Sequence, residues 1–184
     1  MPVTVGTYQQ VALEDPEGHW ELIGGHLRQK PGMTAIHDYT GDSLGRTIAD
    51  QLDKNVLNVR INNARLRVGT GSFRIPDVTV LPMATIRRRL KAASPELDVY
   101  AEPVLFVAEV WSPSTGGYDF EVKLAQYRER GDAEIWFVQP YDRAVTIWRR
   151  QPDGSYVESY HAGGTLAVGS LPGVSIDLGR LFDW

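Results

Sequence analysis

Apolar residues recur at every fourth position between residues 36 and 52, and this spacing predicts a helix early in the chain. Thr34 is a suitable N-cap for that helix. Its buried face would be formed by Ile36, Thr40, Leu44, Ile48 and Leu52. Gly41 and Gly45 weaken the pattern, because each glycine costs a helix about 1 kcal/mol relative to alanine.

Two short hairpins flank this predicted helix. Gly24 and Gly25 separate two half-apolar segments within residues 19–28, and paired glycines supply the positive φ angles of a tight turn. Residues 64–68 and 73–75 alternate in polarity around a Gly69-Thr70-Gly71 turn and lead into a strand at 78–81. Residues 82–102 are polar and charged, which predicts a surface excursion.

The second half of the chain returns to apolar segments. The run 104–110 lies between prolines and predicts a buried central strand. A loop is expected at 112–117, with Gly116-Gly117 as a flexible turn, and a helix at 118–130 with Gly131 as its C′ residue. Further strands are predicted at 135–138, 145–148 and 156–160, before an irregular tail with a short final turn. This order indicates an α/β fold whose sheet contains strands of mixed direction.

Composition places the chain among ordinary globular proteins. Its 184 residues predict a single domain over 1–184, with 42% hydrophobic and 23% charged residues. Cysteine is absent, which excludes disulfides and thiolate chemistry. The first ten residues lack a signal pattern, and no apolar run approaches the roughly 20 residues that span a bilayer. We therefore expect a cytoplasmic protein without a membrane segment.

The charge balance limits how the protein could bind nucleic acid. Its formal net charge is −4, whereas proteins that bind nucleic acid by bulk attraction are basic. Contacts with nucleic acid would have to come from local patches, for which the candidates are Arg87-Arg88-Arg89 with Lys91, and Arg149-Arg150. Solvated arginines beside loops are the competing interpretation of both patches.

Two acidic residues interrupt apolar, strand-like runs: Asp77 within residues 75–80 and Glu109 within 105–113. Neighbouring strands lie about 4.8 Å apart, so both carboxylates could reach one Mg²⁺ at about 2.1 Å from each oxygen. Lys123, on the following predicted helix, could orient a water or neutralise developing charge if that helix packs back along the strand. Spacing alone leaves open that these are ion-paired or solvated side chains.

Two other motifs suggest different chemistry. Gly41-Asp42-Ser43-Leu44-Gly45 matches the nucleophile elbow of serine esterases, which needs a strand before it and a helix after it. The four-residue periodicity instead runs through this motif. The histidines show no metal-ligand spacing, but His37 would open the first helix and could approach a phosphate or an acid.

Taken in order, these motifs resemble the Uma-two branch of the PD-(D/E)XK nuclease superfamily, formerly classed as a domain of unknown function. The resemblance extends from about Trp20 to the C-terminal tail, and it is specific in the order of its pieces. It is carried by Trp20-Glu21-Leu22-Ile23-Gly24-Gly25, His37, Ile75-Pro76-Asp77-Val78, Glu109-Val110-Trp111-Ser112-Pro113-Ser114-Thr115, Lys123-Leu124-Ala125-Gln126-Tyr127, Gly131, Ile135-Trp136-Phe137-Val138-Gln139-Pro140 and Leu171-Pro172-Gly173.

The resemblance implies a restriction-endonuclease-like core that hydrolyses phosphodiester bonds in DNA. It implies Mg²⁺, with Mn²⁺ as a substitute, held by Asp77 and Glu109, while Lys123 organises the attacking water. Glu21 could be a third acidic ligand or a supporting group, with a structural role in its hairpin as the alternative. Gln126 is expected to assist the attacking water, and His37 to contact the substrate. Superfamily nucleases often cut as dimers, so a homodimer is expected by analogy.

The sequence departs from the superfamily pattern at two positions. Trp111 stands where the motif has its lysine, so that Lys123 must act from the helix, and Gln139 replaces an Asp before Pro140. The alternatives are a nuclease-fold binding module that cuts nothing and, third, a serine esterase using Ser43.

Overall fold

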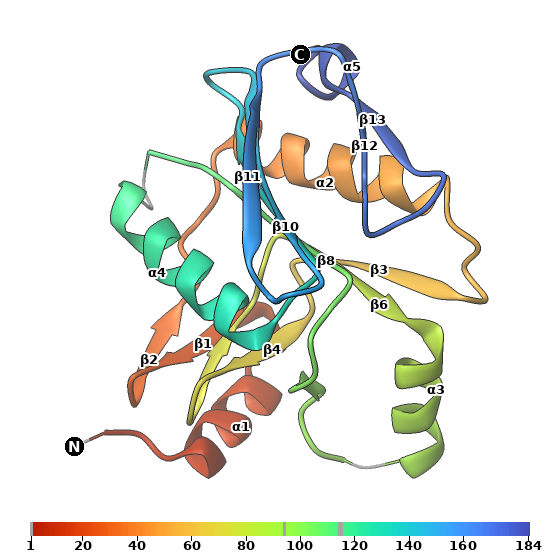
Figure 1. Cartoon of the computed structure of the whole chain (residues 1–184). Coiled ribbons are helices and arrows are strands. Elements are labelled where there is room, and N and C mark those ends of the chain that lie inside the picture. Colours follow the sequence, from red (N-terminus) through yellow and green to blue (C-terminus); the bar gives the residue numbers. More distant parts are fainter. Residues whose placement is uncertain (1, 94, 114–115) are drawn as a thin grey trace.

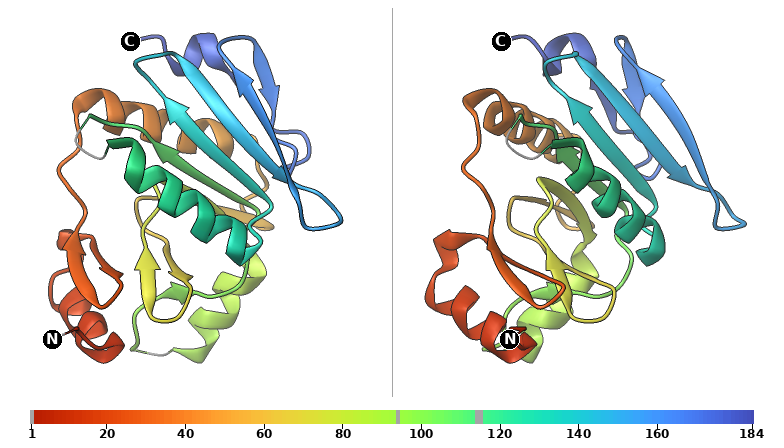
Figure 2. Two further views of the ribbon diagram at one scale, coloured as in Figure 1. Left: turned by 60° about the vertical axis from the view of Figure 1, so that its left-hand side comes forward. Right: turned by 90° about the vertical axis from the view of Figure 1, so that its left-hand side faces the viewer.

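The computed structural model describes residues 2–93, 95–113 and 116–184. Within these ranges the strands form a five-stranded, a six-stranded and a two-stranded sheet. The N-terminal and C-terminal elements lie at opposite ends of the molecule (Figures 1 and 2). The predicted mixed α/β architecture with additional C-terminal strands is confirmed, whereas the single-domain division of 1–184 stays a prediction.

The six-stranded sheet forms the centre of the molecule, in the order β11-β10-β9-β8-β6-β3. Its strands are β3 Leu57–Ile61, β6 Val78–Pro82, β8 Phe106–Val110, β9 Glu134–Gln139, β10 Ala144–Arg150 and β11 Tyr156–His161. The pair β8–β9 is parallel, and the other neighbours in this sheet are antiparallel. The strands predicted from apolar runs are therefore confirmed, with small differences at their ends.

The two faces of this sheet bury different sets of side chains. On one face, the residues that share a cluster with helix α2 (Ala35–Ala49) include Val78, Val80, Phe106 and Ala108. On the other face, the residues that share a cluster with helix α4 (Gly116–Arg130) include Leu81, Val107 and Ile135. Alternate residues of β6 and β8 thus point to opposite helices, as the pleat of a strand requires.

Both predicted helices form, with the N-cap expected for the first and the C′ glycine expected for the second. The Thr34 side chain accepts a hydrogen bond from the His37 backbone N–H at 3.2 Å, which is N-capping geometry. Helix α4 ends at Arg130, and Gly131 follows it with φ +79°. Helix α4 begins at Gly116, so the flexible turn predicted at Gly116-Gly117 is wrong; Ser114 and Thr115 lie outside the described residues.

The five-stranded sheet lies beside the N-terminal helix, in the order β2-β1-β5-β4-β7. Its strands are β1 Trp20–Ile23, β2 His26–Gln29, β4 Arg65–Val68, β5 Ser72–Arg74 and β7 Val99–Tyr100. Both hairpins predicted from glycine turns are confirmed. Helix α1 (Val5–Glu14), which the sequence did not predict, is followed by a 3₁₀ turn (Pro16–Gly18) and stacks Tyr8 on Phe73 with ring centroids 4.9 Å apart.

Two segments contain more regular structure than the sequence predicted. The excursion at 82–102 contains helix α3 (Met83–Ala92) and strand β7. Ile86 is the buried residue of α3 while Leu90 is exposed, so the helix lacks an apolar stripe that a sequence pattern could show. The tail expected to be irregular contains the antiparallel pair β12 (Thr165–Ala167) and β13 (Ser175–Asp177) before helix α5 (Leu178–Leu181).

The C-terminal segment is tied to the central sheet by a buried carboxylate. Glu134 accepts hydrogen bonds from Trp136 Nε1 at 2.7 Å, from Arg149 Nε at 3.2 Å and from the Ser170 backbone N–H at 2.7 Å. Arg149 also donates to the Ala167 carbonyl at 2.6 Å. Burying a charge is tolerated here because several donors compensate it.

None of the helices in the described ranges is both long and apolar enough to cross a membrane.

Two glycines of α2 provide a test of how closely this helix approaches the sheet. A Cβ added at Gly41 would lie 3.7 Å from Val110 Cγ2, whereas one at Gly45 would lie 2.5 Å from Ile61 Cγ1. Gly41→Ala is therefore expected to raise the free energy of unfolding by about 0.5–1 kcal/mol through helix propensity. Gly45→Ala is expected to lower it. Denaturant unfolding measures both, and combining Gly45→Ala with Ile61→Ala should remove the loss.

Tyr8 predicts a loss of stability at alkaline pH. Burial raises the pKa of Tyr8 to about 12, above the value of about 10 in an unfolded chain. The raised pKa contributes stability that is complete below pH 10 and is lost as the pH rises toward 12. Tyr8→Phe should therefore flatten the dependence of the unfolding free energy on pH between 10 and 12, and an unchanged slope would contradict the assignment.

Candidate functional site

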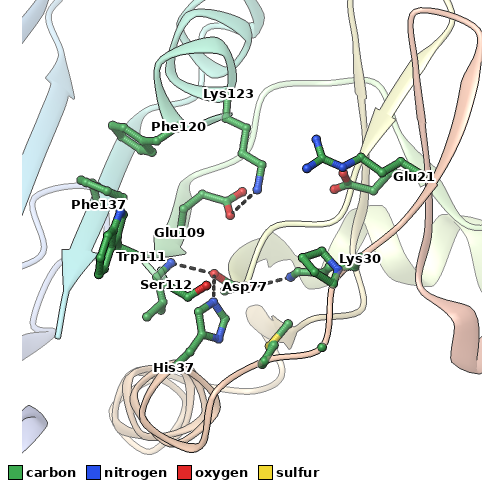
Figure 3. Close-up of a pocket in the computed structure, with 15 residues that line it drawn as sticks. Glu21, Lys30, His37, Asp77, Glu109, Trp111, Ser112, Phe120, Lys123 and Phe137 are labelled. Carbon is green, nitrogen blue, oxygen red and sulfur yellow. Dashed lines mark hydrogen bonds and ion pairs between the residues drawn. The ribbon is translucent and has the colours of Figure 1, made fainter. Parts of the chain in front are cut away.

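Asp77 and Glu109 lie directly across from each other at the ends of β6 and β8. The register pairs Val78 with Ala108 and Thr79 with Val107, so its next step pairs Asp77 with Glu109. The Asn62 N–H donates to the Asp77 carbonyl at 2.8 Å, which continues the β3–β6 ladder to this residue. Opposite residues of antiparallel strands point to the same face, with Cβ atoms about 4.5–5.5 Å apart. Figure 3 shows Glu109 pointing toward Lys123 of α4 and Asp77 toward His37 of α2, so the two acids meet between these helices.

The Asp77 carboxylate is surrounded by donors, and its side chain is 1% exposed. Lys30 Nζ lies 2.6 Å from Oδ1. His37 Nε2 lies 3.3 Å from Oδ2, which also accepts the Val110 backbone N–H at 2.6 Å. Burial alone would raise the pKa of Asp77, but the Lys30 charge and the His37 hydrogen bond together hold this pKa well below its usual range. Asp77 is thus a fixed, ionised carboxylate.

Glu109 has two protein partners from one helix. Lys123 Nζ lies 2.9 Å from Oε2, and the Tyr127 hydroxyl donates to Oε1 at 2.6 Å. Burial raises the pKa of Glu109, and the Asp77 charge adds to that effect, while Lys123 opposes it. The two acids therefore differ in proton affinity although they are neighbours.

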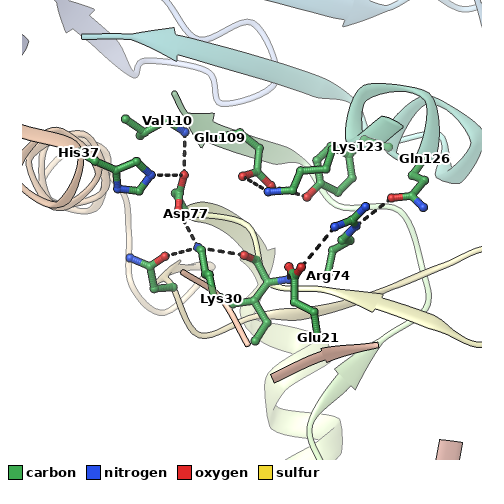
Figure 4. A network of polar contacts seen from close by, with 12 residues as sticks. Glu21, Lys30, His37, Arg74, Asp77, Glu109, Val110, Lys123 and Gln126 are labelled. Carbon is green, nitrogen blue, oxygen red and sulfur yellow. Dashed lines mark hydrogen bonds and ion pairs between the residues drawn. The ribbon is translucent and has the colours of Figure 1, made fainter. Parts of the chain in front are cut away.

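Helix α4 brings Lys123 and Tyr127 to the acids because residues four apart lie on one helix face. The helix packs back along β8 as the sequence analysis required, and Lys123 is buried. Gln126 lies next to this pair in sequence, but its Oε1 accepts a hydrogen bond from Arg74 Nε at 3.0 Å (Figure 4). Gln126 is also not among the residues that line the pocket described below.

Glu21 takes part in a second buried network beside the acids. Its Oε1 accepts the Ile75 backbone N–H at 2.8 Å, and its Oε2 lies 3.2 Å from Arg74 Nη1. Arg74 is itself 1% exposed. These contacts hold the strand that leads into Asp77, so the described contacts of Glu21 and Gln126 are with the scaffold of the site.

A pocket opens directly onto the two acids. It is lined by Glu21, Arg28, Lys30, Pro31, Gly32, Met33, His37, Asp77, Glu109, Val110, Trp111, Ser112, Phe120, Lys123 and Phe137. Phe120 stacks on Phe137 with ring centroids 3.7 Å apart, and Trp111 meets Tyr141 edge-on at 5.5 Å. Trp111, which stands at the position of the motif lysine, thus forms part of an aromatic wall. His37 Nδ1 is buried here and finds no hydrogen-bond partner among the described residues.

The donor set of this pocket fits a hard divalent cation. Mg²⁺ accepts one or two carboxylates and completes its shell with water, and Asp77 and Glu109 supply two carboxylates side by side. Within the described residues, no group of three or more histidine, aspartate or glutamate side chains is arranged to hold a metal. The third acid in the lining, Glu21, is engaged by Arg74 and the Ile75 N–H, so Asp77 and Glu109 remain the expected ligand pair.

The sequence analysis did not find two of the charged residues at the site. Lys30 lies beside Asp77, and Arg74 lies beside Glu21. Lys30 follows β2 and precedes Pro31, a position without a periodic or motif signal. Tyr127, which appears in the sequence only as part of the motif around Lys123, is both buried and hydrogen-bonded to Glu109.

The esterase interpretation of Ser43 is wrong. Residues 41–45 lie inside the continuous helix α2 (Ala35–Ala49), with no strand before them. A nucleophile elbow requires a sharp strand-to-helix turn that exposes the serine hydroxyl. Ser43 instead occupies the middle of a helix.

The mixed sheet, with two opposed acids and a helix-borne lysine, defines a restriction-endonuclease-like protein. A family model described as "Putative restriction endonuclease" (Uma2) matches residues 5–179, and the chain belongs to this family. No curated protein matches the chain. A solved structure, described as "a putative nuclease belonging to DUF820" from Anabaena variabilis ATCC 29413, shares the fold with a TM-score of 0.78 at 17% identity, covering 100% of this chain and 99% of that one.

Glu21 provides a test of the scaffold role. Glu21→Ala removes the carboxylate that pairs with buried Arg74 and is expected to cost about 3–5 kcal/mol of stability. Gln126→Ala removes a single neutral acceptor and should cost only about 1 kcal/mol. Urea unfolding at neutral pH measures both. Equal, small losses would contradict a scaffold role for Glu21.

Proposed function

We propose that this protein is a Mg²⁺-dependent endonuclease that hydrolyses phosphodiester bonds in DNA. The observation that carries the proposal is the register of β6 and β8, which sets Asp77 opposite Glu109 with Lys123 Nζ 2.9 Å from Glu109. Membership of a family described by restriction endonuclease activity supports the same conclusion.

Asp77 and Glu109 are the residues that would hold the ion. A bound Mg²⁺ would stabilise charge on the scissile phosphate and lower the pKa of a coordinated water. The Val110 N–H and His37 fix the orientation of Asp77, and Tyr127 fixes that of Glu109. Such fixed donors orient ligands without reorganisation at the moment of reaction.

Lys123 is the residue best placed to act on the substrate. Its ammonium group lies in the pocket between α4 and β8 and contributes positive charge to both acids. A cation here can orient the attacking water or neutralise charge that develops on the phosphate. His37 lines the same pocket and could contact the phosphate once substrate is present, because its buried Nδ1 has no hydrogen-bond partner among the described residues.

Binding of DNA would depend on Lys123 and His37 in the pocket more than on the arginine-rich segments at 87–91 and 149–150. Arg88 pairs with Glu102 at 3.5 Å and Arg89 with Asp98 at 3.4 Å. Arg149 is engaged by buried Glu134. With a net charge of −4, binding of DNA should rest on few phosphate contacts and show a shallow dependence on salt.

A homodimer, by which both strands could be cut, belongs to the proposal and is tested by sedimentation.

Removing either acid or the lysine tests the proposed activity. Asp77→Asn, Glu109→Gln and Lys123→Met should each lower Mg²⁺-dependent cleavage of plasmid and oligonucleotide DNA by at least about 100-fold. Asp153→Asn, in the exposed turn between β10 and β11, should cleave like the parent. Thermal unfolding establishes that each variant is folded. Full activity in folded Asp77→Asn would overturn the proposal.

One observation favours a second candidate, a binding module that keeps the fold without cutting. Each of the two acids is already paired with a lysine, Asp77 with Lys30 and Glu109 with Lys123. A site that is internally neutralised needs no cation for its stability. This candidate requires that Mg²⁺ and Mn²⁺ leave the melting temperature unchanged, whereas the nuclease requires an increase that Asp77→Asn abolishes.

A further inference from the structure

Lys30 has a role beside the acids that neither the family pattern nor the proposed reaction assigns. Its side chain is 10% exposed, although lysine is almost never buried without a partner. The ammonium group donates to Asp77 Oδ1 at 2.6 Å, to Asn62 Oδ1 at 2.5 Å and to the Ile75 carbonyl at 3.0 Å. A lysine has three N–H donors, and these three acceptors use all of them.

The acceptors around Lys30 are themselves fixed. Asn62 follows β3 with φ +52°, a left-handed conformation that asparagine tolerates better than most residues. Its N–H donates to the Asp77 carbonyl at 2.8 Å, so that Asn62 and Asp77 are joined through the backbone as well as through Lys30. The three acceptors therefore come from two adjacent chain segments held in one register (Figure 4).

This geometry makes Lys30 a fixed charge. An ammonium group whose three donors are occupied would have to give up protein contacts before it could bind a substrate phosphate. Its effect is exerted on Asp77 instead, and through space also on Glu109. A divalent cation between the two acids would approach a positive charge already seated on Asp77, and such repulsion is strong at short range in a buried site.

We propose that Lys30 is a positioning residue: it holds the Asp77 carboxylate in place, and its charge limits how tightly the site binds a divalent cation. This inference rests on the proposed function, because it concerns the ion that the two acids would share. The structure thereby distinguishes the two lysines of the pocket. Lys30 acts on Asp77, one of the two carboxylates that would bind the ion. Lys123 is the lysine that would act on the attacking water or the substrate phosphate.

Calorimetric titration with Mn²⁺ alone, without DNA, tests this role. Lys30→Met and Lys30→Gln should bind Mn²⁺ about five- to tenfold tighter than the parent, because the competing charge is gone. Lys30→Arg keeps the charge and should stay within about twofold. Lys54→Met, at an exposed lysine, is the matched control for loss of a positive charge elsewhere. The glutamine variant retains an N–H donor toward Asp77, so the neutral state is tested even where the methionine variant does not fold.

Stability gives an independent readout of the same role. Without metal, Lys30→Gln should melt below the parent, because Asp77 has lost its counter-ion. With saturating Mn²⁺, the rise in melting temperature should be larger in the variant than in the parent. A purely structural lysine would lower the melting temperature and leave the Mn²⁺ affinity unchanged, and that result would overturn the proposal, as would weaker binding.

The outcomes separate this inference from the proposed function. Mn²⁺ binding by the parent that disappears in Asp77→Asn, with equal affinity in Lys30→Gln, would overturn the role of Lys30 and leave the nuclease proposal standing. Absence of Mn²⁺ binding by the parent would overturn both. Tighter binding in both neutral variants, with an unchanged Lys30→Arg, is the result expected.

Discussion

The structure depends on the burial of two carboxylates next to each other at the end of two antiparallel strands. Asp77 and Glu109 are 1% and 5% exposed, and two like charges in such surroundings are costly unless each is compensated. The surrounding elements provide that compensation from four directions. Lys30 comes from the segment after β2, His37 from α2, the Val110 N–H from β8 itself, and Lys123 with Tyr127 from α4. Much of the chain before residue 131 is arranged around these two side chains.

The charge compensation differs between the two acids, and this difference shifts their pKa values in opposite directions. Asp77 receives a lysine, a histidine and a backbone N–H, so its pKa is depressed, whereas burial and the charge of Asp77 raise the pKa of Glu109. Neighbouring acids whose pKa values are driven apart are a common feature of catalytic sites. Structural ion pairs also shift pKa values, and for that reason the metal titrations decide between an enzyme and a silent module.

Sequence reasoning found the parts of this fold that carry a local signal. The four-residue periodicity located α2, glycine pairs located both hairpins, and apolar runs located the strands that hold the acids. It failed where the signal is not local. Helix α3 buries little besides Ile86, and the β12–β13 pair forms between short segments separated by a loop. Lys30 could not be placed, because its three acceptors lie 32 to 47 residues away in sequence.

The motif that matches a nucleophile elbow has a structural explanation in the same site. Gly41 and Gly45 belong to the face of α2 that packs on β8 and β3, where an added Cβ would contact Val110 and Ile61 respectively. At Gly41 the added atom would also lie 4.0 Å from Asp77 Cβ. Small residues let a helix approach a sheet closely, and this approach brings His37, one turn earlier, to Asp77. The spacing that resembles a nucleophile elbow thus serves helix packing, and it lets α2 hold His37 against Asp77.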